Sequence, residues 1–182
     1  MTALPPTGDA LTLGRGGLRA LHTSLLNNAP DQAIAILQET GYASGEGMYQ
    51  AFCAWLPAAA GVEKPEDLDA GNLSQVLSDF FQAAGWGGLS ITSLGGGALA
   101  LDSTDWAEAE PGTAEIPMCF VSAGMLADFL GRLSGEPVSV MEVECRCRND
   151  ERCRFLSAVP ERLQEVYEAM TAGRSYLEAL TG

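Results

Sequence analysis

Two pairs of short alternating segments constrain the fold of this chain more than any other feature of its sequence. The first pair covers residues 89–94 and 98–101 and is joined by three consecutive glycines. The second pair covers residues 138–148 and 152–159 and is joined by an Asn-Asp-Glu turn. Alternating apolar and polar residues on either side of turn residues are typical of β-hairpins. We therefore predict an antiparallel sheet built from two hairpins.

Most of the remaining chain has apolar residues at helical spacing, which predicts about five helices. Strands and helices that are segregated in this way favour an α+β fold. In the second helix Gly41, Gly45 and Gly47 are expected to kink or divide the element, because glycine is a poor helix former. The predicted helices cover residues 18–28, 30–56, 73–84 and 117–133, and a last one begins at residue 160.

A chain of 182 residues suits one globular domain. Residues 1–10 are rich in proline and glycine and are predicted to be a flexible lead-in. Residues 11–160 are expected to form the domain, and residues 161–182 a C-terminal helix. With Leu163 and Tyr167 on one face, that helix could pack on the domain or form a dimer contact.

The chain is strongly acidic, with 24 Asp and Glu against 10 Lys and Arg and a formal net charge of −14. Such a charge argues against nucleic acid and anionic lipid as partners. The N-terminus lacks the basic and apolar regions of a signal peptide. The longest apolar stretch, residues 117–133, is too short and too polar to span a bilayer. We therefore expect a cytoplasmic protein whose thiols stay reduced.

Five cysteines are an odd number and fit a disulfide framework poorly. Three of them stand with a glutamate in a pattern that could hold a metal, because thiolates bind zinc and a carboxylate can complete its tetrahedral shell. The alternative is that these cysteines are buried apolar residues. The candidate ligands are Cys119, Glu142, Cys145 and Cys153.

The surrounding sequence affects whether these four residues could bind one metal ion. In a regular strand, residues three apart point to opposite faces, so Glu142 and Cys145 could share an ion only if a bulge or strand twist lay between them. Cys147, on the same face as Cys145, is a rival ligand. Neighbouring arginines are expected to offset the negative charge and lower the thiol pKa values. These are Arg146, Arg148, Arg152 and Arg154.

The segments 117–124, 140–145 and 153–155 resemble the 4-vinyl-reductase domain. This hydrocarbon-binding domain occurs in xylene- and phenol-sensing transcriptional activators and in bacteriochlorophyll 4-vinyl reductase. The family pattern is a cysteine that opens a helix, then Glu-x-x-Cys, seven residues and Cys-x-Phe, and this chain meets it. In the phenol sensors these positions hold a structural zinc, so the resemblance implies zinc at the same four residues here.

The resemblance also implies a fold related to haem-type nitric-oxide sensors and to Golgi-transport tethering subunits. Because the family sensors dimerise, it implies a homodimer. The phenol sensors bind the phenol hydroxyl with a histidine and a tryptophan, but the only histidine here, His22, lies well before that position. A more apolar ligand, such as a hydrocarbon, a lipid or a porphyrin-like ring, is therefore favoured.

Aromatic residues outside the cysteine motif are candidates for the wall of a ligand pocket, which needs apolar walls with few polar groups. The alternative is that they are ordinary core residues. Trp106 stands apart because it lies in an acidic loop, where it could be a pocket lid, a partner contact or an anchor of the loop. The candidates are Phe80, Phe81, Trp86, Trp106, Phe120 and Phe129.

These inferences favour a free-standing, zinc-stabilised module that binds or senses an apolar or aromatic small molecule and acts through a separate partner. One alternative is an enzyme or accessory subunit like bacteriochlorophyll 4-vinyl reductase, which would bind a tetrapyrrole and reduce its vinyl group. The sequence has no nucleotide-binding motif and no catalytic acid–base cluster, which argues against an enzyme. The other alternative is an assembly module without a ligand, which a filled core would favour.

Overall fold

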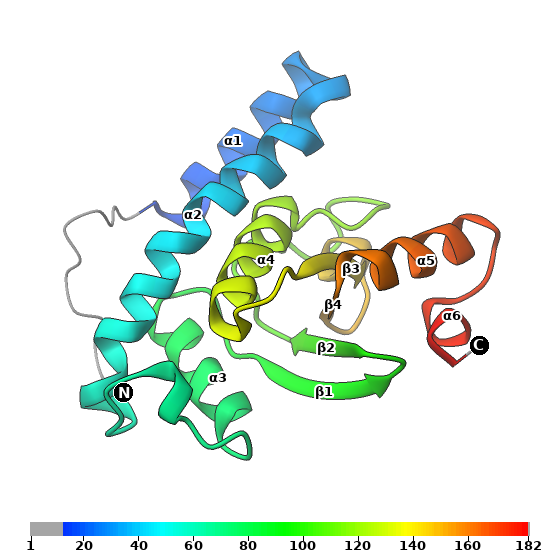
Figure 1. The fold of residues 1–182 in the computed structure, drawn as a ribbon. Helices are drawn as coiled ribbons and strands as arrows, with labels where there is room; N and C mark the ends of the chain where they lie inside the picture. Colours follow the sequence, from blue (N-terminus) through cyan, green and yellow to red (C-terminus); the bar gives the residue numbers. More distant parts are fainter. Residues whose placement is uncertain (1–12, 182) are drawn as a thin grey trace.

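The computed structural model describes residues 13–181, so the predicted lead-in at residues 1–10 lies outside the described part. The predicted α+β fold is confirmed, with six α-helices and one four-stranded antiparallel sheet within the described residues (Figure 1). The last predicted segment forms two helices instead of one. The helices are α1 (Arg15–Asn28), α2 (Pro30–Ala59), α3 (Leu73–Ala83), α4 (Phe120–Ser134), α5 (Pro160–Thr171) and α6 (Tyr176–Thr181). The strands are β1 (Ser90–Gly95), β2 (Ala98–Ser103), β3 (Ser139–Glu144) and β4 (Cys153–Ala158).

The two predicted hairpins lie side by side in one sheet with the strand order β1-β2-β4-β3. Strand β4 is therefore central, and all six of its residues are buried because helices cover both faces of the sheet. Phe155 belongs to the larger core with α2, α3 and α4, whereas its neighbour Leu156 belongs to the smaller core with α5 and α6. Successive side chains of a strand point to opposite faces, so β4 contributes to both cores.

Helix α4 lies in the centre of the domain. Every residue from Val121 to Phe129 is buried, as expected of a helix that is apolar on most of its circumference. The helix ends at Gly135, which has the left-handed φ of 74° that glycine adopts without strain. Most of the apolar stretch at residues 117–133 thus forms an internal helix. Within residues 13–181, no helix combines the length and apolar character needed to cross a membrane.

Helix α2 is continuous over its whole length, so the expectation that its glycines divide it is wrong. The glycines instead allow close contact between α2 and α4. A Cβ atom added at Gly41 would lie 2.0 Å from the carbonyl oxygen of Val121. One added at Gly124 of α4 would lie 2.1 Å from the carbonyl oxygen of Gln38. The two backbones therefore approach so closely that any side chain at these positions would clash.

Helices α5 and α6 pack on the face of the sheet opposite α4 (Figure 1). In α5, Leu163 and Val166 are buried, whereas Tyr167, predicted to share the face of Leu163, is 56% exposed. Packing on the domain, one of the two roles that the sequence left open for the C-terminal helix, is therefore observed.

A polar network ties α6 to three strands. The Tyr176 hydroxyl of α6 accepts a hydrogen bond from Arg154 at 2.8 Å and donates one to Glu144. Arg154 also donates two hydrogen bonds to the carboxylate of Asp102, at 2.6 and 2.7 Å. A bidentate arginine–carboxylate pair of this kind fixes geometry as well as charge. The C-terminal helix is thereby joined to β2, β3 and β4.

The close contact of α2 and α4 leads to a stability prediction. We expect Gly41→Ala to destabilise the protein by about 1–3 kcal/mol, because the added methyl group overlaps the backbone of α4. Chemical denaturation followed by circular dichroism measures the change. Gly47, in the same helix, has nothing within 4 Å of an added Cβ. Gly47→Ala should therefore stabilise the protein by up to about 1 kcal/mol. Equal effects of the two substitutions would contradict this contact.

Candidate functional site

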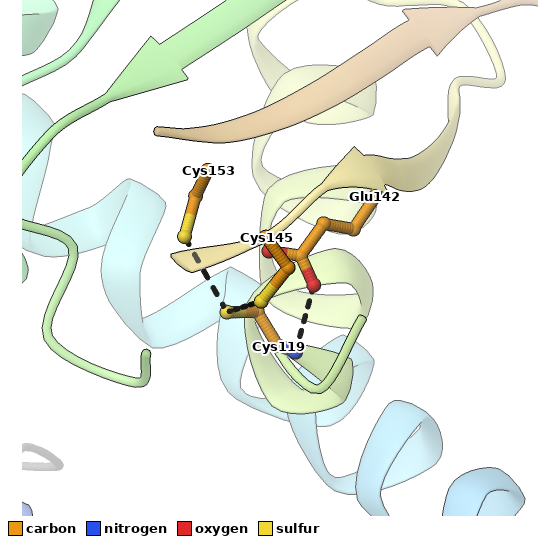
Figure 2. Close-up of side chains that lie close together, drawn as sticks. All are labelled: Cys119, Glu142, Cys145 and Cys153. Carbon is orange, nitrogen blue, oxygen red and sulfur yellow. Dashed lines mark hydrogen bonds between the residues drawn. The ribbon is translucent and has the colours of Figure 1, made fainter. Parts of the chain in front are cut away.

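Three cysteines and a glutamate converge at the start of α4 (Figure 2). Cys119 immediately precedes α4, Glu142 lies in β3, Cys145 follows β3 and Cys153 opens β4. Their sulfur atoms and one carboxylate oxygen all lie within 4.8 Å of one another. The Sγ of Cys119 is 3.9 Å from that of Cys145 and 4.0 Å from that of Cys153. The four predicted ligands therefore lie close enough to share one metal ion.

A β-bulge allows Glu142 and Cys145 to reach the same point. Glu142 pairs with Phe155 of β4, but the next pairing joins Glu144 to Arg154, so β3 has one residue more than β4 here. The extra residue changes the alternation of side chains, and residues three apart can then point to one side. The bulge is the irregularity that the two ligands were expected to need in order to share an ion.

Beyond the bulge, the chain leaves the sheet earlier than the sequence predicts. Strand β3 ends at Glu144, and a 3-10 turn at Arg146–Arg148 takes the place of the predicted strand up to residue 148. Asp150 holds this turn, because its Oδ2 accepts hydrogen bonds from the backbone N–H of Cys145 and from the Arg148 guanidinium, both at 2.7 Å. The turn positions Cys145 at the site.

The early turn also removes the reason for treating Cys147 as equivalent to Cys145. Cys147 is buried, but its Sγ accepts a hydrogen bond from the backbone N–H of Glu110 at 3.3 Å. Its sulfur is not one of the four converging ligand atoms. The alternation that made Cys147 a rival ligand assumed a regular strand, which ends before it.

The geometry and chemistry of the four residues fit a tetrahedral ion. With Zn–S bonds of about 2.3 Å, two sulfurs of a tetrahedron lie about 3.8 Å apart, and the separations from Cys119 are 3.9 and 4.0 Å. Glu142 Oε2 accepts the N–H of Cys119 at 2.9 Å, whereas its Oε1 is buried without a hydrogen-bond partner. Burial, with the nearby Cys145 thiol, raises the pKa of Glu142 to about 9. A cation would satisfy this unpaired oxygen.

The three thiols differ in acidity because they share hydrogen bonds. Burial raises the pKa of Cys119 well above the ordinary value, and its interactions with the other two thiols add to this effect. The hydrogen bond from Cys119 lowers the pKa of Cys145 to about 6 and that of Cys153 to about 5. Cys145 and Cys153 therefore form thiolates most readily, and the thiolate is the form that binds a metal.

The arginines near the site do not have the role expected from the sequence. The lowered thiol pKa values come first from hydrogen bonds between thiols. Three of the four guanidinium groups instead pair with carboxylates. These pairs are Arg148–Asp150 at 2.7 Å, Arg152–Glu144 at 2.9 Å and Arg154–Asp102 at 2.6 Å.

Most of the aromatic residues predicted for a pocket form one cluster between α3, α4 and the sheet. The ring centroid of Phe80 is 5.3 Å from that of Phe81 and 6.0 Å from that of Phe129. Trp106 joins this aromatic cluster through Phe81 and Trp86, each at 5.7 Å. All of these side chains except the half-buried Trp86 are fully buried.

The aromatic cluster is a filled core in this structure. Phe120 lies outside it and stacks against His22 at 6.4 Å. Two surface hollows of about 600 and 350 Å³ lie between α2, α4 and residues 135–140, and neither is lined by a residue of the aromatic cluster. A ligand would therefore have to displace side chains to enter the cluster.

Trp106 anchors its loop in the core, which is one of the three roles that the sequence left open. The side chain is fully buried, and its indole N–H donates to Ser122 Oγ at 2.7 Å. Tryptophan usually finds such a partner when it is buried.

Glu108, two residues after Trp106, is a site residue that the sequence reasoning missed. Its side chain is 1% exposed, and it accepts the backbone N–H groups of Val121 at 3.0 Å and of Ser122 at 2.7 Å. His22 Nε2 lies 2.9 Å from Glu108 Oε1. Glu108 lies in an acidic loop that has no apolar periodicity. The one sequence feature that could have indicated its burial is the large apolar Trp106 nearby.

Comparison with known sequences shows that part of this chain is similar to a known domain. Residues 107–157 match the sequence model of the 4-vinyl-reductase domain. This confirms the predicted resemblance to that domain, and the matched segment contains all four converging residues. No match was found among curated proteins.

Solved structures resemble the chain over most of its length at low sequence identity. The phenol-responsive sensory domain of the transcription activator PoxR, solved with phenol, has a TM-score of 0.60 and 17% identity, covering 90% of this chain and 82% of that chain. A trafficking protein particle complex subunit 3 from Naegleria fowleri, covalently bound to palmitic acid, has a TM-score of 0.59 and 12% identity, covering 79% and 91%. A vinyl-4-reductase family protein from Methanocaldococcus jannaschii has a TM-score of 0.44 and 15% identity, covering 84% and 98%. The first two show that the fold is shared with these proteins.

Proposed function

We propose that this protein is a zinc-stabilised module that binds an apolar or aromatic small molecule and acts through a separate partner. The match to the 4-vinyl-reductase domain and the fold shared with a phenol-responsive sensory domain support this reading. The observation that carries it is an aromatic core that includes the converging cysteines, in a fold of which one solved example holds phenol. The ligand would bind within the aromatic cluster.

The zinc would be structural. Four protein ligands leave no open position for water or substrate, which is the arrangement of a closed site. Such an ion would join the start of α4 to β3 and β4. Its ligands come from segments that are far apart in the chain. The unpaired Oε1 of Glu142 and the sulfur separations near 4 Å support this proposal.

Elemental analysis of the purified protein should find about one zinc per chain. Cys145→Ser should lose the metal and unfold at a lower temperature, because a structural zinc site contributes directly to folding. Cys147→Ser is the matched control, since this cysteine is also buried but lies outside the four ligands. It should keep the metal. Fully folded, metal-free wild-type protein would contradict the proposal.

Native mass spectrometry of protein purified from its own host should reveal a co-purifying hydrophobic molecule that denaturation releases. Titration with naphthalene and with palmitic acid, followed by tryptophan fluorescence, tests the same site because Trp86 and Trp106 lie in the aromatic cluster. Phe81→Trp should weaken binding by filling the cluster further. Tyr42→Ala, in the surface hollows, should leave binding unchanged. If Tyr42→Ala weakens binding and Phe81→Trp does not, the ligand binds in the surface hollows instead.

The packing of the aromatic cluster favours a second candidate function, that of an assembly module without a ligand. Phe80, Phe81, Trp106 and Phe129 are fully buried and belong to one packed core, so the core needs no ligand to fill it. If this function is correct, no molecule co-purifies and neither naphthalene nor palmitic acid binds. The same experiments therefore separate the two candidates.

We further propose that the module is a homodimer. Apolar side chains are exposed on the hairpin of α1 and α2, which extends away from the sheet (Figure 1), and they include Leu21 at 39% and Ile34 at 40% exposure. Analytical ultracentrifugation should give a mass twice the 19.1 kDa of the chain. Leu21→Glu should shift the protein toward monomer, whereas Leu177→Glu, an exposed leucine of α6, should not. A monomeric mass at every protein concentration would refute the proposal.

A further inference from the structure

Helix α1 has one buried side chain. His22 is the only buried residue of this helix, and the others are exposed or half-buried. Arg19 forms an ion pair with Glu110 at 2.5 Å, but the two side chains are 62% and 40% exposed. Ion pairs on the surface contribute little to stability. The contact made by His22 therefore does most to hold α1 against the loop before α4.

The partner of His22 is a carboxylate that is already fixed to α4. Glu108 accepts hydrogen bonds from the backbone N–H groups of Val121 and Ser122, in the first turn of that helix. Its Oε1 lies 2.9 Å from His22 Nε2, which is within ion-pair distance, although this buried nitrogen makes no hydrogen bond of regular geometry within the described residues. With Glu108 held in this way, the position of α1 depends on the first turn of α4.

The same turn of α4 contacts the aromatic cluster. Ser122 is fully buried, donates its hydroxyl hydrogen to Glu108 and accepts the indole N–H of Trp106. Trp106 packs against Phe81 and Phe155. Polar contacts therefore run without interruption from Trp106 through Ser122 and Glu108 to His22.

We propose that these four residues form a latch that couples the packing of the aromatic cluster to the position of α1. Moving Trp106 removes the donor that orients the Ser122 hydroxyl, and hydrogen bonds in such a chain strengthen one another in a buried environment. The bond from Ser122 to Glu108 then weakens, and the carboxylate that anchors His22 shifts. The use of this latch to report a bound ligand rests on the proposed function, whereas the coupling itself does not.

Hydrogen exchange on the full, metal-loaded chain tests the anchor. His22→Leu puts an apolar side chain in place of the imidazole and removes the nitrogen that contacts Glu108, so it should speed exchange across residues 15–28 by about tenfold while β4 is unchanged. His22→Gln can still donate to Glu108 and should restore most of the protection. Arg19→Gln is the control, because the ion pair it removes is exposed. Equal exchange in His22→Leu and wild type would overturn the latch.

A double-mutant cycle tests the coupling. Trp106→Phe keeps an aromatic ring but removes the N–H donor, and it should speed α1 exchange about threefold when His22 is present and not at all in His22→Leu. An equal effect in both backgrounds would overturn the coupling. If Trp106→Phe does not fold, Ser122→Ala breaks the same chain and takes its place in the cycle.

The same variants separate failure of the latch from failure of the proposed function. When naphthalene binds, it should change α1 exchange in wild type and leave it unchanged in His22→Leu. If neither naphthalene nor palmitic acid binds while the cycle still shows coupling, the ligand-binding function fails and the latch stands. If a probe binds and the cycle shows no coupling, the latch fails and the ligand-binding function stands.

Discussion

The capping of α4 is the interaction on which the rest of the structure depends. The first N–H groups of a helix have no partner within the helix, and here they lie inside the domain, where water cannot satisfy them. Two carboxylates from distant segments do so. Glu142 accepts the N–H of Cys119, and Glu108 accepts those of Val121 and Ser122.

Each of these carboxylates brings another part of the chain to the same helix end. Glu142 lies in β3, so its position brings the cysteines of the second hairpin next to Cys119. Glu108 brings its own loop, with Trp106, to the start of α4, and it also contacts His22 of α1. The candidate metal site and the latch are therefore neighbours that share one turn of one helix. Because Gly41 contacts the backbone of Val121, α2 is fixed to this turn as well.

Much of the fold could be predicted because its signals are local, whereas the predictions that failed concern contacts between segments. The observed strands begin close to their predicted starts, since the alternation that marks a hairpin depends only on neighbours in the chain. The four converging residues could be named because a family pattern preserves their spacing. The helix propensity of glycine suggested a break in α2, but Gly41 instead allows α2 to contact the backbone of α4. The residues next to Gly41 in the sequence do not indicate this contact. The first strand of the second hairpin was expected to continue to residue 148, yet β3 ends at Glu144, where Asp150 accepts the backbone N–H of Cys145.

The sequence by itself determined most of the secondary-structure elements, the acidic character and the identity of the four candidate ligands, because periodicity, charge and motif spacing are properties of the chain. Only the tertiary structure decided that Glu108 caps α4, that His22 is buried against it and that Trp106 anchors its loop. These roles depend on which backbone N–H groups are left unsatisfied inside the domain and on which side chains the folded chain brings within hydrogen-bonding distance of them. That information is absent from any single segment, since each partner comes from a different one.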